Sequence, residues 1–408
     1  MNHFITNIHV NKLFHLNNFD IPIDDEKFPH LIITGKNGSG KTILLNAVAD
    51  FLNKIKDDIS LSFLNQDRLI QLWKTQLQNS LKETDIAHAK RMLKVAKDNK
   101  ETLMGKVNVN IHNNIIEKYS QDDFLISYYC ATRIVKMREP INPTKPQYKK
   151  KGDVNETVTS QFLNFLSDLK IQEALARNEK QYKDADDISV WFEDLTKTLG
   201  DIFQDSDLKL EFNYKDYSFH LFTDGKRFKF TELSQGFSAI IDIVADLILK
   251  MQGNELTRNY QKEGIVLIDE IETHLHLGLQ KAILPLLTKL FPNIQFIVTT
   301  HSPFVLNSIP NAVAYDLEHR EILSDLTEYS YESLAEGYFG VKTPSSYAEM
   351  QLENLKKLLE KKEWSDSDKL EIKRLTTDFD KIPETVSPLI KGEYRQLAVK
   401  YSNRLKEL

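Results

Sequence analysis

The sequence has very little cysteine: it contains one thiol, Cys130, in 408 residues. One thiol can form neither a disulfide framework nor a zinc knuckle within a single chain. Cys130 lies inside the apolar and aromatic run Leu125–Ala131. We therefore expect its side chain to be buried and inert.

Long apolar runs and an excess of positive charge are also missing. No run approaches the roughly 20 apolar residues that span a bilayer, and residues 1–4 show neither the basic region nor the apolar core of a signal peptide. The formal net charge of −6 excludes a protein that coats nucleic acid by bulk charge, although it leaves a local basic groove open. We expect a soluble, cytoplasmic protein with no membrane partner.

Hydrophobic residues make up 41% of the chain, which is enough for a substantial core. Short apolar strands such as 30–34 and segments with helical spacing follow one another, which predicts an α/β fold. We predict a head over residues 1–340, containing a helical insertion at 64–104 and a helical lobe segment at 155–205. A helical C-terminal region is expected over 341–408.

Two polar stretches interrupt these elements. The acid cluster Asp184–Asp187 predicts a solvated turn rather than a metal site. Residues 140–154 hold three prolines and a cluster of lysines at 145, 149, 150 and 151, a composition typical of an exposed loop. This loop is also the one obvious candidate in the sequence for contacts to nucleic-acid phosphates.

The pattern G-x-x-x-x-G-K-[ST] is complete over Gly35–Thr42, after an apolar strand and before a helical segment. The glycines let successive backbone N–H groups point at phosphates, and the helix N-terminus adds partial positive charge. We expect Lys41 to reach the β- and γ-phosphates of ATP and Thr42 to ligate Mg²⁺. The residues expected to form this phosphate cradle are Asn37, Gly38, Ser39, Gly40, Lys41 and Thr42.

A continuous apolar strand over 264–268 ends in two acids, Asp269 and Glu270. Such a run belongs in a parallel sheet that is covered on both faces. In P-loop enzymes the first acid holds Mg²⁺, and an acid beside it can orient and deprotonate the attacking water. We assign Asp269 to the metal and Glu270 to the water.

A third strand, over 295–300, ends at His301. The carboxyl edge of a parallel sheet is where open α/β folds bind their ligands. We therefore expect His301 to lie at the catalytic site, where it could sense the γ-phosphate by a hydrogen bond.

The segment Leu233-Ser234-Gln235-Gly236-Phe237 opens a second helix, with Ser234 as a good N-cap and Gly236 leaving backbone amides open. This segment resembles the Leu-Ser-Gly-Gly-Gln signature of ABC ATPases, which binds the γ-phosphate held by the opposite subunit. Gln235 and Phe237 depart from that signature, whereas Ser234 and Gly236 keep their places. The resemblance implies an ABC-type head that completes its ATP site as a homodimer.

Within that class the motifs look most like the RecF, SMC and OLD group. More narrowly they resemble bacterial predicted ATP-binding proteins, including PtuA-type ATPase subunits of antiphage systems. In this family the segment after the two acids crosses the dimer interface, which corresponds here to Glu272, Thr273, His274 and His276. His274 and His276 could instead be metal ligands, although no third ligand is evident.

Related OLD proteins carry a nuclease domain after the ATPase, and the pair Asp366 and Asp368 imitates a nuclease Asp-x-Asp. No apolar strand precedes this pair, so we expect a helix cap. With no effector chemistry evident in the chain, we expect an effector protein in trans, a nuclease, whose activity the ATP cycle gates in defence against phage.

Three rival interpretations remain open from the sequence. A RecF- or SMC-like DNA-repair ATPase would bind DNA directly and hydrolyse ATP faster in its presence. A transporter ATPase would need a membrane partner, which the signature variant and the segment 128–133 disfavour. A scaffold that binds ATP without turnover would show intact binding and no hydrolysis.

Overall fold

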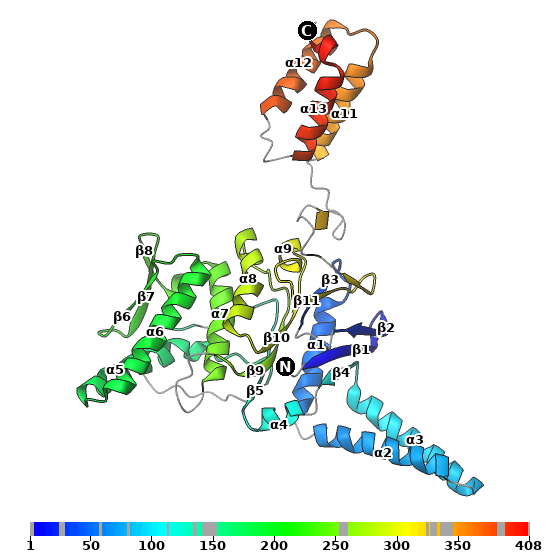
Figure 1. The fold of residues 1–408 in the computed structure, drawn as a ribbon, viewed down its shortest axis with the longest axis vertical. Coiled ribbons are helices and arrows are strands. Elements are labelled where there is room, and N and C mark those ends of the chain that lie inside the picture. Colours follow the sequence, from blue (N-terminus) through cyan, green and yellow to red (C-terminus); the bar gives the residue numbers. More distant parts are fainter. Residues whose placement is uncertain are drawn as a thin grey trace. The chain divides into compact units, whose positions relative to one another are not determined.

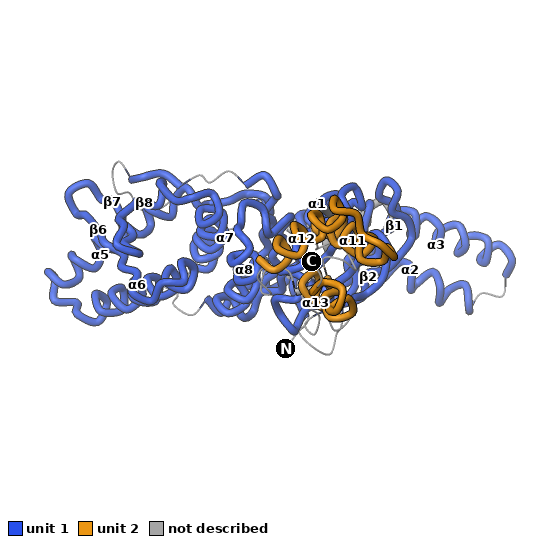
Figure 2. The backbone as a smooth tube through the Cα atoms, turned by 90° about the horizontal axis from the view of Figure 1, so that it is seen from above, with its two compact units in different colours: residues 1–329 blue, residues 330–408 orange. Residues whose placement is uncertain are grey.

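The structure is a computed structural model, and the residues it describes are 4–23, 29–56, 59–79, 82–111, 114–133, 137–140, 153–252, 260–323, 326, 333–334, 346–381 and 388–406. The chain divides into two compact units, residues 1–329 and 330–408 (Figure 2). Each unit is described by itself below.

The first unit alternates strands and helices along the chain (Figure 1). Its strands are β1 (Ile5–Leu13), β2 (Leu16–Pro22), β3 (His30–Thr34), β4 (Val107–Ile111), β5 (Phe124–Tyr129), β6 (Lys209–Asn213), β7 (Ser218–Thr223), β8 (Lys226–Lys229), β9 (Glu263–Ile268), β10 (Ile294–Thr299), β11 (Ala312–Asp316) and β12 (Glu321–Leu323). Its helices are α1 (Lys41–Lys56), α2 (Ile59–Asn79), α3 (Glu83–Met104), α4 (Asn114–Ser120), α5 (Phe162–Asn178), α6 (Tyr182–Phe203), α7 (Gln235–Met251), α8 (Leu277–Leu290) and α9 (Pro303–Leu306), with short 3₁₀ turns η1 (Thr159–Gln161) and η2 (Phe230–Glu232).

A six-stranded sheet forms the centre of this unit, in the order β12-β11-β3-β10-β9-β5. Five neighbouring strands run parallel, and β12 pairs antiparallel at the edge. Every residue of β3, β5 and β10 is buried, as expected for parallel strands covered on both faces. The register places the last residues of β3, β10, β9 and β5 side by side, so the segments that follow them meet at one edge.

Two antiparallel sheets, β2-β1-β4 and β6-β7-β8, accompany the central sheet. Helix α1 buries Leu44, Leu45, Val48 and Leu52, which lie on one face of the helix, in a core shared with β1, β3 and β5. Helices α2 and α3 pack against each other and extend away from α1 (Figure 1). The α/β fold is therefore confirmed, and the stretch predicted as a helical insertion lies in α2 and α3.

Helix α6 corrects one expectation about the helical lobe. The cluster Asp184–Asp187 lies inside this helix rather than in a turn. Ala185, Ile188 and Trp191 bury one face of α6, so helical spacing prevails over local polarity. Asp184 falls in the first turn, where a negative charge interacts favourably with the helix dipole.

A buried polar network joins α7 to β5. Asp246 on α7 is fully buried and accepts hydrogen bonds from the Tyr129 hydroxyl (2.6 Å) and from the Val158 backbone N–H (2.6 Å), and it pairs with Lys250 (2.8 Å). The Lys250 ammonium also donates to the Ser127 hydroxyl at 3.0 Å. Burial and the neighbouring Asp246 raise the pKa of Tyr129, which keeps its hydroxyl protonated as a donor. Helix α7 is thus fixed to the sheet by charge-assisted hydrogen bonds.

The expectation for Cys130 was wrong, because this side chain is exposed. Strand β5 ends at Tyr129, so Cys130 is the first residue beyond the buried part of the sheet. The predicted lysine loop over 140–154 lies mostly outside the described residues. Among the helices of the described residues, none combines the length and the apolar character that a membrane span requires.

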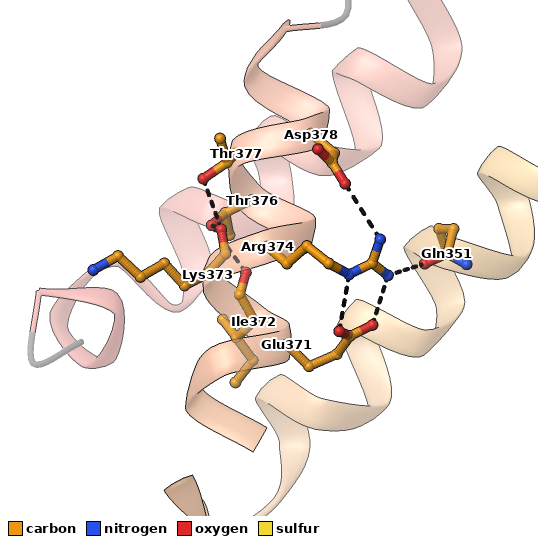
Figure 3. Close-up of polar contacts among 8 residues, drawn as sticks. All are labelled: Gln351, Glu371, Ile372, Lys373, Arg374, Thr376, Thr377 and Asp378. Carbon is orange, nitrogen blue, oxygen red and sulfur yellow. Dashed lines mark hydrogen bonds and ion pairs between the residues drawn. The ribbon is translucent and has the colours of Figure 1, made fainter. Parts of the chain in front are cut away.

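The second unit contains helices α11 (Ser346–Glu360), α12 (Asp366–Lys381), α13 (Pro388–Lys400) and α14 (Ser402–Leu405). Leu355, Leu359 and Leu375 belong to a core of its own. Arg374 on α12 binds Glu371 and Asp378 of the same helix and Gln351 of α11, which links the two helices (Figure 3).

The pair Asp366 and Asp368 lies at the start of α12, as expected for a cap. The Ser365 hydroxyl accepts from the Asp368 N–H at 3.2 Å, and the Asp368 carboxylate accepts from the Ser365 N–H at 3.1 Å. This reciprocal arrangement is a capping box.

His30 at the start of β3 should make the stability of the protein depend on pH. Its Nδ1 accepts the Phe296 N–H at 3.1 Å, and burial lowers its pKa to about 4. Between pH 6.5 and about 4 the unfolded chain binds a proton that the folded chain excludes, so the free energy of unfolding falls as the pH falls. We expect a loss of about 2–3 kcal/mol between pH 7 and pH 4.5 from this group, measured by urea denaturation. The variant His30→Gln should lack this component, and an identical pH dependence in both proteins would contradict the prediction.

Candidate nucleotide-binding site

The loop between β3 and α1 has the backbone of a phosphate cradle. Gly35, Gly38 and Gly40 have φ values of 136°, 84° and 101°, which side chains with a Cβ rarely adopt. A Cβ on Gly40 would also lie 2.9 Å from a methyl carbon of Leu16. The β1–β2 turn supports the loop, because the His15 ring bonds the Ser39 carbonyl at 3.1 Å.

Lys41 is buried at the start of α1, and its ammonium donates to the carbonyls of Gly35 (2.8 Å) and Lys36 (3.1 Å). Burial lowers the pKa of Lys41, and the charges of Glu270, Glu272 and Asp269 oppose that shift. The loop thus holds a desolvated cation beside its own backbone, facing the acids that follow β9.

Asp269 fits a cation site. Its Oδ1 accepts from the Thr42 hydroxyl (3.2 Å) and the Thr299 hydroxyl (2.6 Å), and its N–H bonds the Tyr129 carbonyl. Its Oδ2 is buried without a hydrogen-bond partner among the described residues. A buried carboxylate oxygen with no donor is costly unless a cation binds it, and hard oxygen ligands suit Mg²⁺. Thr42 and Asp269 are the residues that would hold Mg²⁺.

Glu270 adopts a left-handed backbone conformation with φ 45°, which is unusual for a residue with a side chain. Its N–H donates to the Thr299 hydroxyl at 2.8 Å, and its carboxylate accepts from the Thr273 hydroxyl at 3.3 Å. An Arg133 N–H donates to its carbonyl at 3.4 Å. This backbone turns the chain sharply after Asp269, so neighbouring acids occupy different environments.

Glu272 connects the acid segment to the end of β10. Its carboxylate accepts from the Thr300 hydroxyl at 2.7 Å and from the His301 N–H at 2.5 Å. Burial raises the pKa of Glu272, and these two hydrogen bonds act against the rise. Burial and the nearby Lys41 charge lower the pKa of His301. A neutral imidazole beside the cradle can donate or accept a hydrogen bond.

The signature segment lies at the start of α7. Ser234 occupies the N-cap position as expected, but its side chain makes no capping hydrogen bond. Gly236 packs so tightly that a Cβ there would lie 2.9 Å from the His274 carbonyl oxygen. Phe237 stacks on Phe203 with ring centroids 4.3 Å apart. The segment predicted as the signature therefore packs directly against the segment that follows the acids.

The structure brings together one part of the predicted site and keeps another apart. Lys41, Thr42, Asp269 and Glu270 meet at the carboxyl edge of the sheet with His301. Helix α7, which carries Ser234, packs against α5, α6, α8 and β5, whereas α1 packs against α2, α4, β4 and β10. No hydrogen bond among the described residues links Ser234 or Gly236 to the cradle.

The alternative role of His274 and His276 as metal ligands gains no support. His276 is the N-cap of α8, and its ring accepts from the Leu279 N–H. The group of possible ligands found within the described part of the chain is Asp316, His319 and Glu321 instead. There Asp316 is already bonded by the His319 ring and two backbone N–H groups, as in an ordinary turn.

Two residues of this site were not singled out from the sequence. Thr299 joins Asp269 to the Glu270 backbone, and Arg133 reaches the Glu270 carbonyl. Thr299 carried a usable signal, since it is a polar residue at the end of a buried strand. For Arg133, the sequence gave no indication of a role at the site beyond its place in the segment 128–133.

A mostly parallel sheet that carries a phosphate cradle, two acids and a histidine at one edge defines the class: the chain contains an ABC-like P-loop ATPase head. The family described as "AAA domain, putative AbiEii toxin, Type IV TA system" matches residues 114–307. The chain is similar to the Septu protein PtuA of Bacillus mycoides (strain KBAB4), with 28% identity over 301 residues. These matches confirm the predicted resemblance of the chain to PtuA-type ATP-binding proteins.

The chain is also 48% identical over 80 residues to the retron Ec83 probable ATPase of Escherichia coli and 37% identical over 114 residues to the retron Vc95 probable ATPase of Vibrio cholerae. The match to PtuA covers 74% of this chain and 38% of PtuA. The matches to the Ec83 and Vc95 proteins cover 15% and 21% of those proteins. The chain therefore spans well under two thirds of the length of these relatives. Among solved structures, it is similar to the SMC head domain from Thermotoga maritima, with a TM-score of 0.36 and 12% identity over 77% of this chain and 94% of that one.

Proposed function

We propose that this protein binds ATP with Mg²⁺ and hydrolyses it in sites shared between two copies of the chain. The observation that carries the proposal is the division of the site. The cradle, the acids and His301 meet at one edge of the sheet, while Ser234 and Gly236 lie at the start of a different helix. A second copy would supply its signature to the γ-phosphate that this copy holds.

The reaction assigns one task to each group. The cradle N–H groups and Lys41 bind the β- and γ-phosphates, and Mg²⁺, when held by Thr42 and Asp269, neutralises charge on them. The Glu270 carboxylate takes a proton from water as the water oxygen bonds the γ-phosphorus, and the bond to the β-phosphate oxygen breaks to release ADP. His301 donates a hydrogen bond to a γ-phosphate oxygen.

The ATP cycle gates a partner effector, a nuclease, in antiphage defence. The similarity to PtuA and to two retron ATPases supports the defence role. ATP holds the dimer together, and hydrolysis loosens it.

The variant Glu270→Gln tests both the chemistry and the dimer. Loss of the general base should lower kcat by roughly 10²- to 10⁴-fold, while nucleotide binding is kept. The variant should therefore accumulate as an ATP-bound dimer, visible by light scattering with and without ATP. Glu263→Gln, which removes a partly exposed acid at the opposite end of β9, is the matched control and should remain as active as wild type.

Two results would count against the proposal. Hydrolysis at the wild-type rate in Glu270→Gln would remove Glu270 from the role of base. Co-purification of the trapped dimer with DNA alone, together with DNA-stimulated hydrolysis by wild type, would favour the DNA-repair ATPase. A second protein with nuclease motifs that co-purifies in a fixed ratio is the expected result.

A further inference from the structure

Arg133 lies at the edge of the sheet where β5 ends, four residues beyond Tyr129. Its Nη2 donates to the Glu270 carbonyl at 3.4 Å, and the same carbonyl accepts the Thr273 N–H at 3.0 Å. Burial lowers the pKa of Arg133, and the carboxylates of Asp242, Glu272 and Asp269 oppose that shift. The guanidinium is therefore held among acids and directed at the backbone of the residue that we assign as the base.

We propose that Arg133 is a positioning residue that fixes the Glu270 peptide in its left-handed conformation and thereby aims the Glu270 carboxylate at the attacking water. A left-handed backbone at a residue with a side chain persists only where the surroundings over-determine it. Thr299 holds the N–H side of Glu270, and Arg133 holds the carbonyl side. Without the carbonyl contact, nothing among the described residues except the Thr273 N–H restrains that end.

The hydrogen bonding of Arg133 favours this role over a purely stabilising one. Its Nε and Nη1 atoms are buried and have no acceptor among the described residues. Unpaired buried donors cost stability, so the hydrogen bonding of Arg133 does not by itself account for burying its guanidinium. By contrast, the guanidinium of Arg374 in the second unit has all three nitrogens bonded to acceptors.

The proposal rests on the proposed hydrolysis, so the first test is kinetic. Arg133→Lys keeps the charge and loses the planar fork, and Arg133→Ala loses both. Both variants should bind labelled ATP as wild type does and keep KM within about twofold, while kcat falls roughly 10- to 100-fold. Millimolar guanidinium should restore part of the kcat of Arg133→Ala. Arg138→Lys, an exposed change in the same segment, is the matched control.

Hydrogen exchange in the nucleotide-free protein provides a second test that does not need turnover. The Thr273 and Leu275 N–H groups bond the carbonyls of Glu270 and Glu272, and both should exchange faster in the Arg133 variants than in Arg138→Lys. Wild-type protection in those variants, or kcat equal to wild type, overturns the proposal. Wild type that binds ATP without hydrolysing it defeats the proposed function instead, and the exchange result then decides by itself whether Arg133 fixes Glu270.

Discussion

Replacing Lys41 by alanine should weaken ATP binding by roughly 10²- to 10⁴-fold. The buried ammonium bonds two loop carbonyls, which places it where phosphate oxygens bound by the loop would compete for it. Each hydrogen bond to a charged group contributes about 1.5–3 kcal/mol, and about two such bonds are lost. A titration with a fluorescent ATP analogue measures the effect as a change in Kd.

Lys36→Ala in the same loop is the matched control. The Lys36 side chain is 65% exposed and pairs with Glu318, so it should contribute little to affinity. Equal losses in Lys41→Ala and Lys36→Ala would mean that the loop attracts nucleotide by general charge rather than through a placed cation.

Replacing Asp246 by alanine should be among the most destabilising single changes in the first unit. The change leaves the buried Lys250 ammonium without its counter-charge. It also leaves the Tyr129 hydroxyl and the Val158 N–H without the carboxylate that accepts their hydrogen bonds. Removing one partner of a buried pair costs about 3–5 kcal/mol, because the other charge stays buried and uncompensated. The urea midpoint of the first unit, followed by tryptophan fluorescence, should fall accordingly.

The variant Asp201→Ala tests whether burial of the ion pair causes the large loss of stability expected for Asp246→Ala. Asp201 pairs with Lys289 at 2.7 Å, but these side chains are 36% and 66% exposed. Exposed pairs contribute about 0–1 kcal/mol. If Asp201→Ala lost as much stability as Asp246→Ala, burial would not be the cause. Partial recovery of the urea midpoint in the double variant Asp246→Leu, Lys250→Met would support burial as the cause.

Local patterns were sufficient to predict the strands and the glycine loop that carry the proposed phosphate cradle. The strand over 30–34 is followed by Gly35, whose spacing to Gly40, Lys41 and Thr42 is typical of phosphate-binding loops, and the acids follow an unbroken apolar run. Chemistry that depends on neighbours in sequence can be predicted from sequence. The α/β class follows for the same reason.

The contacts of Arg133 and Thr299 could not be predicted in this way, because they join residues that are distant in the chain. The Arg133 bond spans 137 residues, and its geometry depends on the pairing of β5 with β9. The prediction for Cys130 failed for a related reason, since a shift of one residue at the end of a strand decides whether a side chain is inside or outside. The position of Asp184–Asp187 within α6 is set by burial of the apolar face of that helix, which a local count of acids does not detect.

The network between α7 and β5 has a mechanical consequence. The ion pair between Asp246 and Lys250 lies within α7, and each of its members is hydrogen-bonded to β5, through Tyr129 and Ser127. Helix α7 therefore cannot slide or bend at that point without breaking charge-assisted hydrogen bonds, so the two elements move as one rigid body. A displacement of the α7 N-terminus at Ser234 would therefore also move β5, through the hydrogen bond between Asp246 and Tyr129, and with β5 the adjoining strand β9. We therefore expect α7, β5 and β9 to rotate together rather than α7 to rearrange internally.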